Sequence, residues 1–124
     1  MMRTAFRPGR IGIISRSGGN TMTLAYYLMK SGLGVSTAIG VGGDAYIGSS
    51  WAELLELFQD DPETDAVVAY GEIGGVNEEG AADCIRASKY RKPLIALIGG
   101  QYARQGMRFG HAGAIVGAHS GSAQ

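Results

Sequence analysis

Cysteine, histidine and net charge are scarce in this chain of 124 residues, and each shortage excludes a class of protein. The single cysteine, Cys84, rules out an internal disulfide bond and a cysteine-based zinc site. Eleven basic and eleven acidic residues cancel, which argues against binding to nucleic acid or to a membrane surface. No apolar run is long enough to span a bilayer. The 45% hydrophobic and 18% charged residues are typical of a globular protein.

The length of the chain fits one domain, residues 1–124. Its start, MMRTAFRPGR, lacks the apolar centre of a signal peptide and runs directly into a predicted strand, so we do not expect a targeting peptide. The expected location is the cytoplasm, or the mitochondrial matrix if a transit peptide has been removed.

Short apolar runs alternate with helical patterns along the whole chain. The predicted strands are 11–15, 35–41, 65–71 and the run KPLIALIGG, with 112–118 as a fifth candidate. The predicted helices are 21–30, 51–59 and 78–90. This alternation predicts an α/β fold with a parallel sheet and helices on both faces. The strands are nearly continuous runs of Val, Ile, Ala and Leu, as expected for strands that are buried on both faces.

Two of the helices carry residues that predict how they begin and which face they bury. Ser50 and Glu53 form a capping box for the second helix, and Asn77 is the expected cap of the third. The predicted buried stripe of the second helix is Trp51, Leu54, Leu55 and Phe58. That of the third helix is Ala81, Cys84, Ile85 and Ser88.

Glycine is abundant, with 21 residues, and its clusters directly follow the apolar runs. In an open α/β sheet, ligands bind beyond the carboxyl ends of the strands, where glycine lets the backbone approach them closely. The alternative is that these glycines serve only the tight turns of the fold. The clusters are Gly18-Gly19, Gly42-Gly43, Gly74-Gly75 and Gly99-Gly100.

The segment SRSGGNTMT joins a predicted strand to a predicted helix. The start of a helix offers free N–H groups and a partial positive charge, so it binds anions, and Arg16 adds a full charge. Neither a P-loop nor a GxGxxG spacing is present. The alternative is that Ser17 or Asn20 only caps the helix. The residues predicted to bind a phosphate are Ser15, Ser17, Gly18, Gly19 and Asn20.

His111, in the motif GHAGA, is the strongest catalytic candidate. A ring between glycines and alanine is unshielded, so one nitrogen can accept a phosphoryl group while the other donates a hydrogen bond. Glu72, at the end of a predicted strand, is the candidate acceptor that would fix the tautomer. The alternatives are a structural histidine and a solvated glutamate. His119 is read as exposed and non-catalytic, and no metal ligands are predicted. Weaker substrate-binding candidates are Asp44, Gly74 and Gly75.

Three motifs taken together carry a resemblance to a known family. GRIGIISRSGG, GVGGDAYIGSS with VVAYGEIGG, and MRFGHAGAI resemble, in order and spacing, the second domain of succinyl-CoA synthetase α-subunits. The wider family is the nucleoside-diphosphate-forming acyl-CoA synthetases, which includes ATP-citrate lyase. The resemblance extends from about Pro8 to Gly121. It implies a flavodoxin-like, doubly wound parallel sheet of about five strands in a three-layer αβα arrangement.

The resemblance also implies a chemistry. His111 would become phosphorylated, Glu72 would contact it, and the SRSGG segment would supply one of two helix N-termini facing the phosphohistidine. The family's reaction interconverts acyl-CoA, NDP and phosphate with a free acid, CoA and NTP. CoA, ATP or GTP, and Mg²⁺ would be bound mainly outside this chain.

The resemblance further implies partners. A β-subunit or another partner with an ATP-grasp domain would bind the nucleotide, and a CoA-binding domain would complete the α-subunit. Relative to the family domain, we expect this chain to lack that CoA-binding domain and the C-terminal end. The substrate would be a dicarboxylic or tricarboxylic acid, because SRSGGN in place of SRSGTL leaves citrate or malate activation open beside succinate.

Two other functions compete with the phosphoryl relay. One is a hydrolase with a triad of Ser15 or Ser17, His111 and Glu72, although no GxSxG motif is present. The other is a non-catalytic assembly or regulatory module that retains the motifs.

Overall fold

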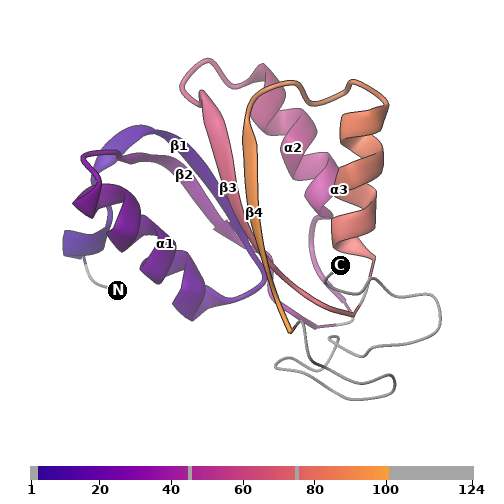
Figure 1. Cartoon of the computed structure of the whole chain (residues 1–124), viewed down its shortest axis with the longest axis horizontal. Coiled ribbons are helices and arrows are strands. Elements are labelled where there is room, and N and C mark those ends of the chain that lie inside the picture. The colour runs from indigo at the N-terminus through magenta and orange to yellow at the C-terminus, as the bar shows by residue number, and fades with distance from the viewer. Residues whose placement is uncertain (1–2, 45, 75, 101–124) are drawn as a thin grey trace.

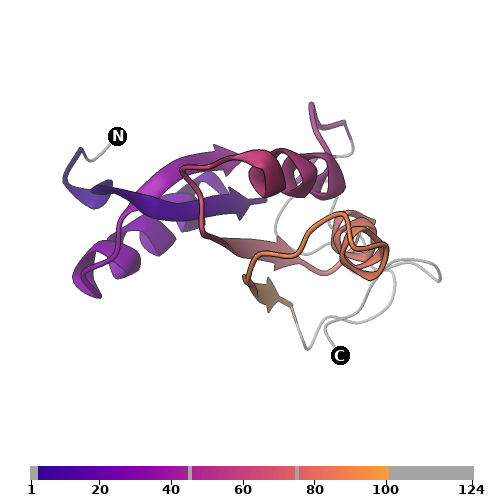
Figure 2. The ribbon, with the colours of Figure 1, turned by 90° about the horizontal axis from the view of Figure 1, so that it is seen from above.

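The computed structural model of the chain describes residues 3–44, 46–74 and 76–100, which form a three-layer α/β fold (Figure 1). The elements in chain order are η1 (Arg3–Ala5), β1 (Pro8–Ser15), α1 (Gly18–Lys30), β2 (Val35–Gly40), α2 (Trp51–Asp60), β3 (Ala66–Glu72), α3 (Asn77–Arg86) and β4 (Leu94–Gly99). Helix α1 covers one face of the sheet, and α2 and α3 cover the other (Figures 1 and 2). The predicted α/β class is confirmed. None of the described helices has the length and apolarity needed to cross a membrane.

The sheet is parallel and has the order β2-β1-β3-β4 in the described residues. From β1 the chain moves outward to β2 and then returns to β3 on the other side of β1. This order is that of a flavodoxin-like sheet, and its reversal creates a switch point between the carboxyl ends of β1 and β3. The predicted fifth strand, 112–118, lies outside the described residues.

The core lies between the sheet and helices α2 and α3. The predicted stripe of α2 is confirmed, because Trp51, Leu54, Leu55 and Phe58 are all buried. The predicted capping box is also present, with the Ser50 side chain accepting from the Glu53 N–H and the Glu53 carboxylate accepting from the Ser50 N–H. Gly12 lets β1 approach this helix, since a Cβ there would lie 2.7 Å from a Phe58 ring carbon.

The start of α3 differs from the prediction. Asn77 is the first residue of the helix, not its cap, and Val76 occupies the cap position without a side-chain hydrogen bond. The Asn77 side-chain oxygen instead accepts a hydrogen bond from the Trp51 N–H at 3.4 Å. A tertiary contact between the starts of α2 and α3 thus takes the place of a local cap.

The far end of α3 also differs. The helix ends at Arg86, before the predicted Tyr90, and Ser88 adopts a left-handed φ of 57°. Burial of Ala81 and Cys84 is confirmed, but Ile85 and Ser88 are exposed. Ser88 is missing from the stripe because the helix ends before it, whereas Ile85 lies within the helix but on its exposed side.

Strand β4 has no fully buried residue, contrary to the expectation for parallel strands. Leu94 packs against the core, whereas Ile95 and Leu97 are 63% and 59% exposed. Among the described helices, α1 packs against β1, β2 and β3, and none covers that face of β4. The apolar run therefore predicted the strand correctly, but not its burial.

Candidate functional site

Two serines build the turn between β1 and α1. The Ser15 hydroxyl is buried, donates to the Ser17 carbonyl at 2.8 Å and accepts from the Ser17 N–H at 3.1 Å. Ser17 is the N-cap of α1, and its Oγ accepts from the Asn20 N–H at 3.4 Å. The capping role weighed for Ser17 is confirmed. These bonds hold the start of α1 at the carboxyl end of β1.

Gly18 and Gly19 are the first two residues of α1, and both are exposed. Their N–H groups lie in the first turn, where no earlier turn of helix supplies an acceptor. Among the residues that the structure describes, a Cβ on Gly18 would meet nothing within 4 Å. Other glycines at this edge are needed by the backbone itself, because Gly42, Gly74 and Gly100 have φ values of 82°, 87° and 96°. The fold explains those glycines but not Gly18.

Glu72 ends β3 at the same edge of the sheet and is 5% exposed. Ser15 pairs with Tyr70 across the β1–β3 ladder, and the next residue of the turn, Arg16, donates its N–H to the Tyr70 carbonyl at 3.0 Å. The structure thus brings Glu72 and the SRSGG turn together at the switch point, as predicted.

Arg16 occupies a different place from the one predicted. Its side chain was expected to add charge to the phosphate site, but the residue is 2% exposed and its guanidinium turns toward β3. Nη1 donates to the carbonyls of Glu72 and Gly74, at 2.6 and 2.7 Å, and to Glu78 Oε1 at 3.2 Å. The carbonyls past the end of β3 need donors, and Arg16 supplies them. Its buried Nε has no acceptor among the described residues.

The remaining site candidates divide into described and undescribed residues. Asp44 is exposed in the connection between β2 and α2, and the Gly74 carbonyl is held by Arg16. His111, Gly75 and His119 lie outside the described residues, so their positions stay predictions. Within residues 3–44, 46–74 and 76–100, no three His, Cys, Asp or Glu side chains gather to hold a metal ion.

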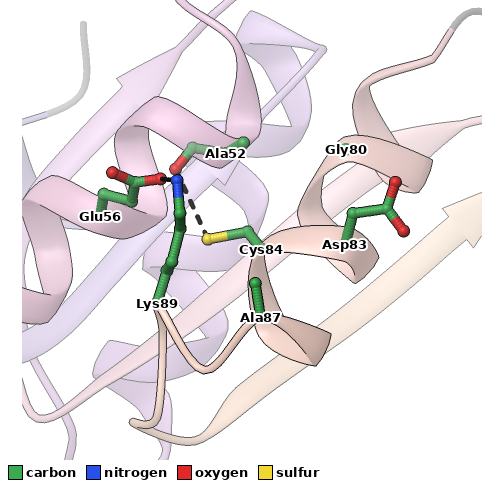
Figure 3. A pocket seen from close by; sticks show the side chains of 7 residues that line it. All are labelled: Ala52, Glu56, Gly80, Asp83, Cys84, Ala87 and Lys89. Carbon is green, nitrogen blue, oxygen red and sulfur yellow. Dashed lines mark hydrogen bonds and ion pairs between the residues drawn. The ribbon is translucent and has the colours of Figure 1, made fainter.

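A cavity of about 290 Å³ lies between α2 and α3 (Figure 3). The Lys89 ammonium binds the Glu56 carboxylate there at 3.0 Å, and the Cys84 thiol lies 3.8 Å from the Ala52 carbonyl. Burial, with a smaller contribution from Glu56, raises the pKa of the Cys84 thiol, so the thiolate that a nucleophile needs is disfavoured. The Lys89 and Glu56 charges of this cavity are therefore paired with each other, the thiol is held neutral, and the exposed Asp83 carboxylate binds Arg86 at 2.8 Å. Its lining residues are Ala52, Glu56, Gly80, Asp83, Cys84, Ala87 and Lys89.

Comparison with known sequences identifies relatives over nearly the whole chain. A succinate–CoA ligase [ADP-forming] subunit alpha 2 from Archaeoglobus fulgidus is 51% identical over 119 residues, which is 96% of this chain and 41% of the relative. An ADP-forming sulfoacetate-CoA ligase subunit from Bilophila wadsworthia is 48% identical over 111 residues, 90% of this chain and 38% of the relative. The chain therefore spans about two fifths of the length of these curated relatives.

Solved structures give the same relationship. ATP citrate lyase from Methanothrix soehngenii, in complex with citrate and coenzyme A, matches 91% of this chain and 19% of its own with a TM-score of 0.84 and 29% identity. A dinucleotide-forming acetyl-coenzyme A synthetase from Ca. Korarchaeum cryptofilum matches 75% of this chain and 20% of its own, with a TM-score of 0.59 and 27% identity. The CoA-ligase family model matches residues 14–123. The resemblance read from the motifs is confirmed, and the chain belongs to the CoA-ligase family.

Proposed function

We propose that this chain carries the phosphohistidine of an NDP-forming acid–CoA ligase, with His111 relaying a phosphoryl group between nucleotide and acid. The observation that supports this most is the exposed Gly18-Gly19 start of α1, beside Glu72 at the switch point. Glycine costs stability in a helix relative to alanine, and no other described residue comes within 4 Å of the place that a Cβ at Gly18 would take. A ligand that must approach the backbone closely accounts for this glycine.

In the direction of acid activation, a neutral His111 nitrogen attacks the γ-phosphorus of the nucleoside triphosphate. The N–P bond forms, the P–O bond to the β-phosphate breaks, and the diphosphate leaves. A carboxylate oxygen of the acid then attacks the same phosphorus, releasing the histidine and giving an acyl phosphate. The CoA thiolate attacks the acyl carbon, and inorganic phosphate leaves.

The residues of this chain have separate roles in the relay. The N–H groups of Gly18 and Gly19, with the positive end of the α1 dipole, stabilise the negative phosphoryl oxygens. Ser15, Ser17 and Asn20 hold the turn that presents those N–H groups. Glu72 accepts a hydrogen bond from the second ring nitrogen of His111, which fixes the tautomer and makes the first nitrogen more nucleophilic.

The rest of the reaction needs partners. A relative is named as the alpha subunit of a ligase, so we assign Mg²⁺ and ATP or GTP to an ATP-grasp partner such as a β-subunit. CoA is assigned to a CoA-binding domain. The relatives are named for succinate and sulfoacetate, and a structural neighbour holds citrate. We therefore propose that the substrate is an acid of this kind, with two or three acidic groups. Separately, we propose a cytoplasmic location.

The test is phosphorylation of the chain in complex with its nucleotide-binding partner, Mg²⁺ and γ-labelled ATP. The expected label is labile to acid and stable to base, as a phosphohistidine is, and is absent in His111→Asn. Acid-stable label on serine would support the hydrolase instead, although the buried Ser15 hydroxyl already donates to the Ser17 carbonyl. A labelled relative serves as the positive control. If that relative is labelled and this chain is not, the result would support the non-catalytic module.

A further inference from the structure

A buried ion pair lies directly behind the proposed site. Arg16 Nη1 and Glu78 Oε1 are 3.2 Å apart, and their side chains are only 3% and 18% exposed. The pair joins the β1–α1 turn to the first turn of α3. Removing two charges from water is costly, and a buried ion pair is often no more stabilising than apolar side chains of similar size. Stability alone is therefore a weak reason for this pair.

The pair holds Glu72 by both of its backbone polar groups. Glu78 Oε1 accepts from the Glu72 N–H at 3.1 Å, and Arg16 Nη1 donates to the Glu72 carbonyl at 2.6 Å. Gly71 leaves room for the carboxylate, because a Cβ there would lie 2.5 Å from Glu78 Oε1. Because the Glu72 N–H and carbonyl are both bound to this one ion pair, the direction in which the Glu72 side chain leaves the backbone is constrained.

Arg16 also belongs to the anion-binding turn. It stands between Ser15 and Ser17, the two residues that present the start of α1, and its own N–H is bound to the Tyr70 carbonyl at 3.0 Å. One residue thus links the phosphate-binding N–H groups to the backbone of Glu72. A shift of either loop would be transmitted to the other through this side chain.

We propose that Arg16 and Glu78 are positioning residues, which set the Glu72 carboxylate relative to the Gly18-Gly19 N–H groups during phosphoryl transfer. The role rests on the proposed function, because it acts through Glu72. Transfer requires reacting groups to be aligned closely, so a small displacement of Glu72 slows the reaction without unfolding the protein.

The test uses the double variant Arg16→Met/Glu78→Met in the full ligase assembly. Removing both charges avoids leaving one unpaired in the interior, so the variant is expected to fold. The matched control is Arg10→Met/Asp65→Met, which removes the exposed pair at the amino end of β1 and β3, with Nε and Oδ2 2.6 Å apart. The measurements are the single-turnover rate of protein phosphorylation, the KM for the nucleotide, the folded fraction by circular dichroism, and the amide shift of Glu72 by NMR.

We expect the double variant to stay folded, to keep its KM, to show a shifted Glu72 amide signal and to transfer phosphoryl at least roughly tenfold more slowly. The control is expected to transfer at the wild-type rate. A folded double variant that transfers as fast as wild type, or a rate that falls only with the folded fraction, would overturn the positioning role alone. A wild-type assembly that takes no label would overturn the proposed function and the positioning role together.

Discussion

Glu72 ends strand β3 and Gly18 begins helix α1, both at the switch-point edge of the sheet. Glu72 supplies a carboxylate from a rigid strand end, whereas Gly18 contributes only a backbone N–H and the absence of a side chain. In the proposed function, phosphoryl transfer depends on the side chain of Glu72 and on the absence of a side chain at Gly18. Each can be altered with little change to the fold.

Glu72→Gln keeps the size of the side chain but removes its charge. We expect the fold to be retained and the rate of His111 phosphorylation to fall at least about tenfold, because a neutral amide supports the developing positive charge on the ring less well. Rapid quench with labelled ATP measures the rate. An unchanged rate would remove Glu72 from the mechanism.

Gly18→Ala adds one methyl group at a place where the described part of the chain leaves open space. We expect the free energy of unfolding to stay within about 1 kcal/mol of wild type, since alanine is a better helix former than glycine. Phosphorylation is expected to slow, because the methyl group obstructs a ligand on the N–H groups. Gly80→Ala in α3, where a Cβ likewise meets no described atom within 4 Å, is the control and is expected to transfer normally. Equal rates in both variants would contradict an anion site at Gly18.

The sequence predicted that Glu72 and the SRSGG turn share an edge of the sheet, and their role in a site stays a prediction. That Glu72 meets the SRSGG turn follows from strand order, since carboxyl ends of parallel strands share an edge. The role of Arg16 could not be predicted, because the Glu72 and Gly74 carbonyls that bind it are brought near only by the fold. The contact of Glu78 with Glu72 could not be predicted either, because a glutamate in a first helical turn is already explained by its interaction with the helix dipole.

At the scale of elements, α2 is held at both ends by specific polar contacts. Its start has the Ser50–Glu53 capping box. At its end, Lys92 Nζ donates to the carbonyls of Phe58, Asp61 and Thr64 at 2.6, 2.7 and 2.7 Å. Only the start was visible in the sequence, because a capping box is local whereas Lys92 is about thirty residues beyond the helix end.

Lys92→Met is expected to lower the free energy of unfolding by roughly 1.5–3 kcal/mol, since it leaves three carbonyls without their charged donor. Urea denaturation measures this loss. Lys30→Met, at an exposed lysine that lies 5.7 Å from the Tyr26 ring centre, is the control and is expected to cost less than about 1 kcal/mol. Similar losses in the two variants would contradict the end contact of α2.

The predictions that failed for α3 and β4 concern features that depend on contacts with other elements of the fold. The apolar period of α2 predicted its buried face, because that helix packs along its length on the sheet and α3. The predicted cap of α3 was wrong because the Asn77 side chain binds the start of α2, which is distant in sequence. The predicted burial of β4 was wrong because burial depends on which helix covers the strand. Local patterns do not contain that information.

At the scale of the whole molecule, Tyr90 couples unfolding to alkaline pH. The residue is 2% exposed, donates its hydroxyl to the Pro93 carbonyl at 3.1 Å, and has its pKa raised by burial to about 12. The pKa of a tyrosine in the unfolded chain is ~10, so the unfolded state loses the tyrosine proton at a lower pH than the folded state does. The free energy of unfolding therefore falls as the pH rises above this value. The stabilisation is fully present below pH ~10 and is lost by pH ~12.

The expected loss between those values is about 2–3 kcal/mol of unfolding free energy. Urea denaturation at several alkaline pH values measures it, with Tyr90→Phe as the comparison. The unfolding free energy of the variant should decline less with pH. Part of the remaining decline comes from the Cys84 thiol, whose raised pKa acts in the same direction. Identical declines in the two proteins would show that Tyr90 is not the group responsible.

The most direct test of the whole account is a crystal structure of the assembly trapped after phosphorylation. We predict a phosphoryl group on a ring nitrogen of His111, with its oxygens about 3 Å from the Gly18 or Gly19 nitrogen, and the Glu72 carboxylate on the other ring nitrogen. A phosphoryl group on a different residue, or one beyond hydrogen-bonding reach of both glycine nitrogens, would contradict it.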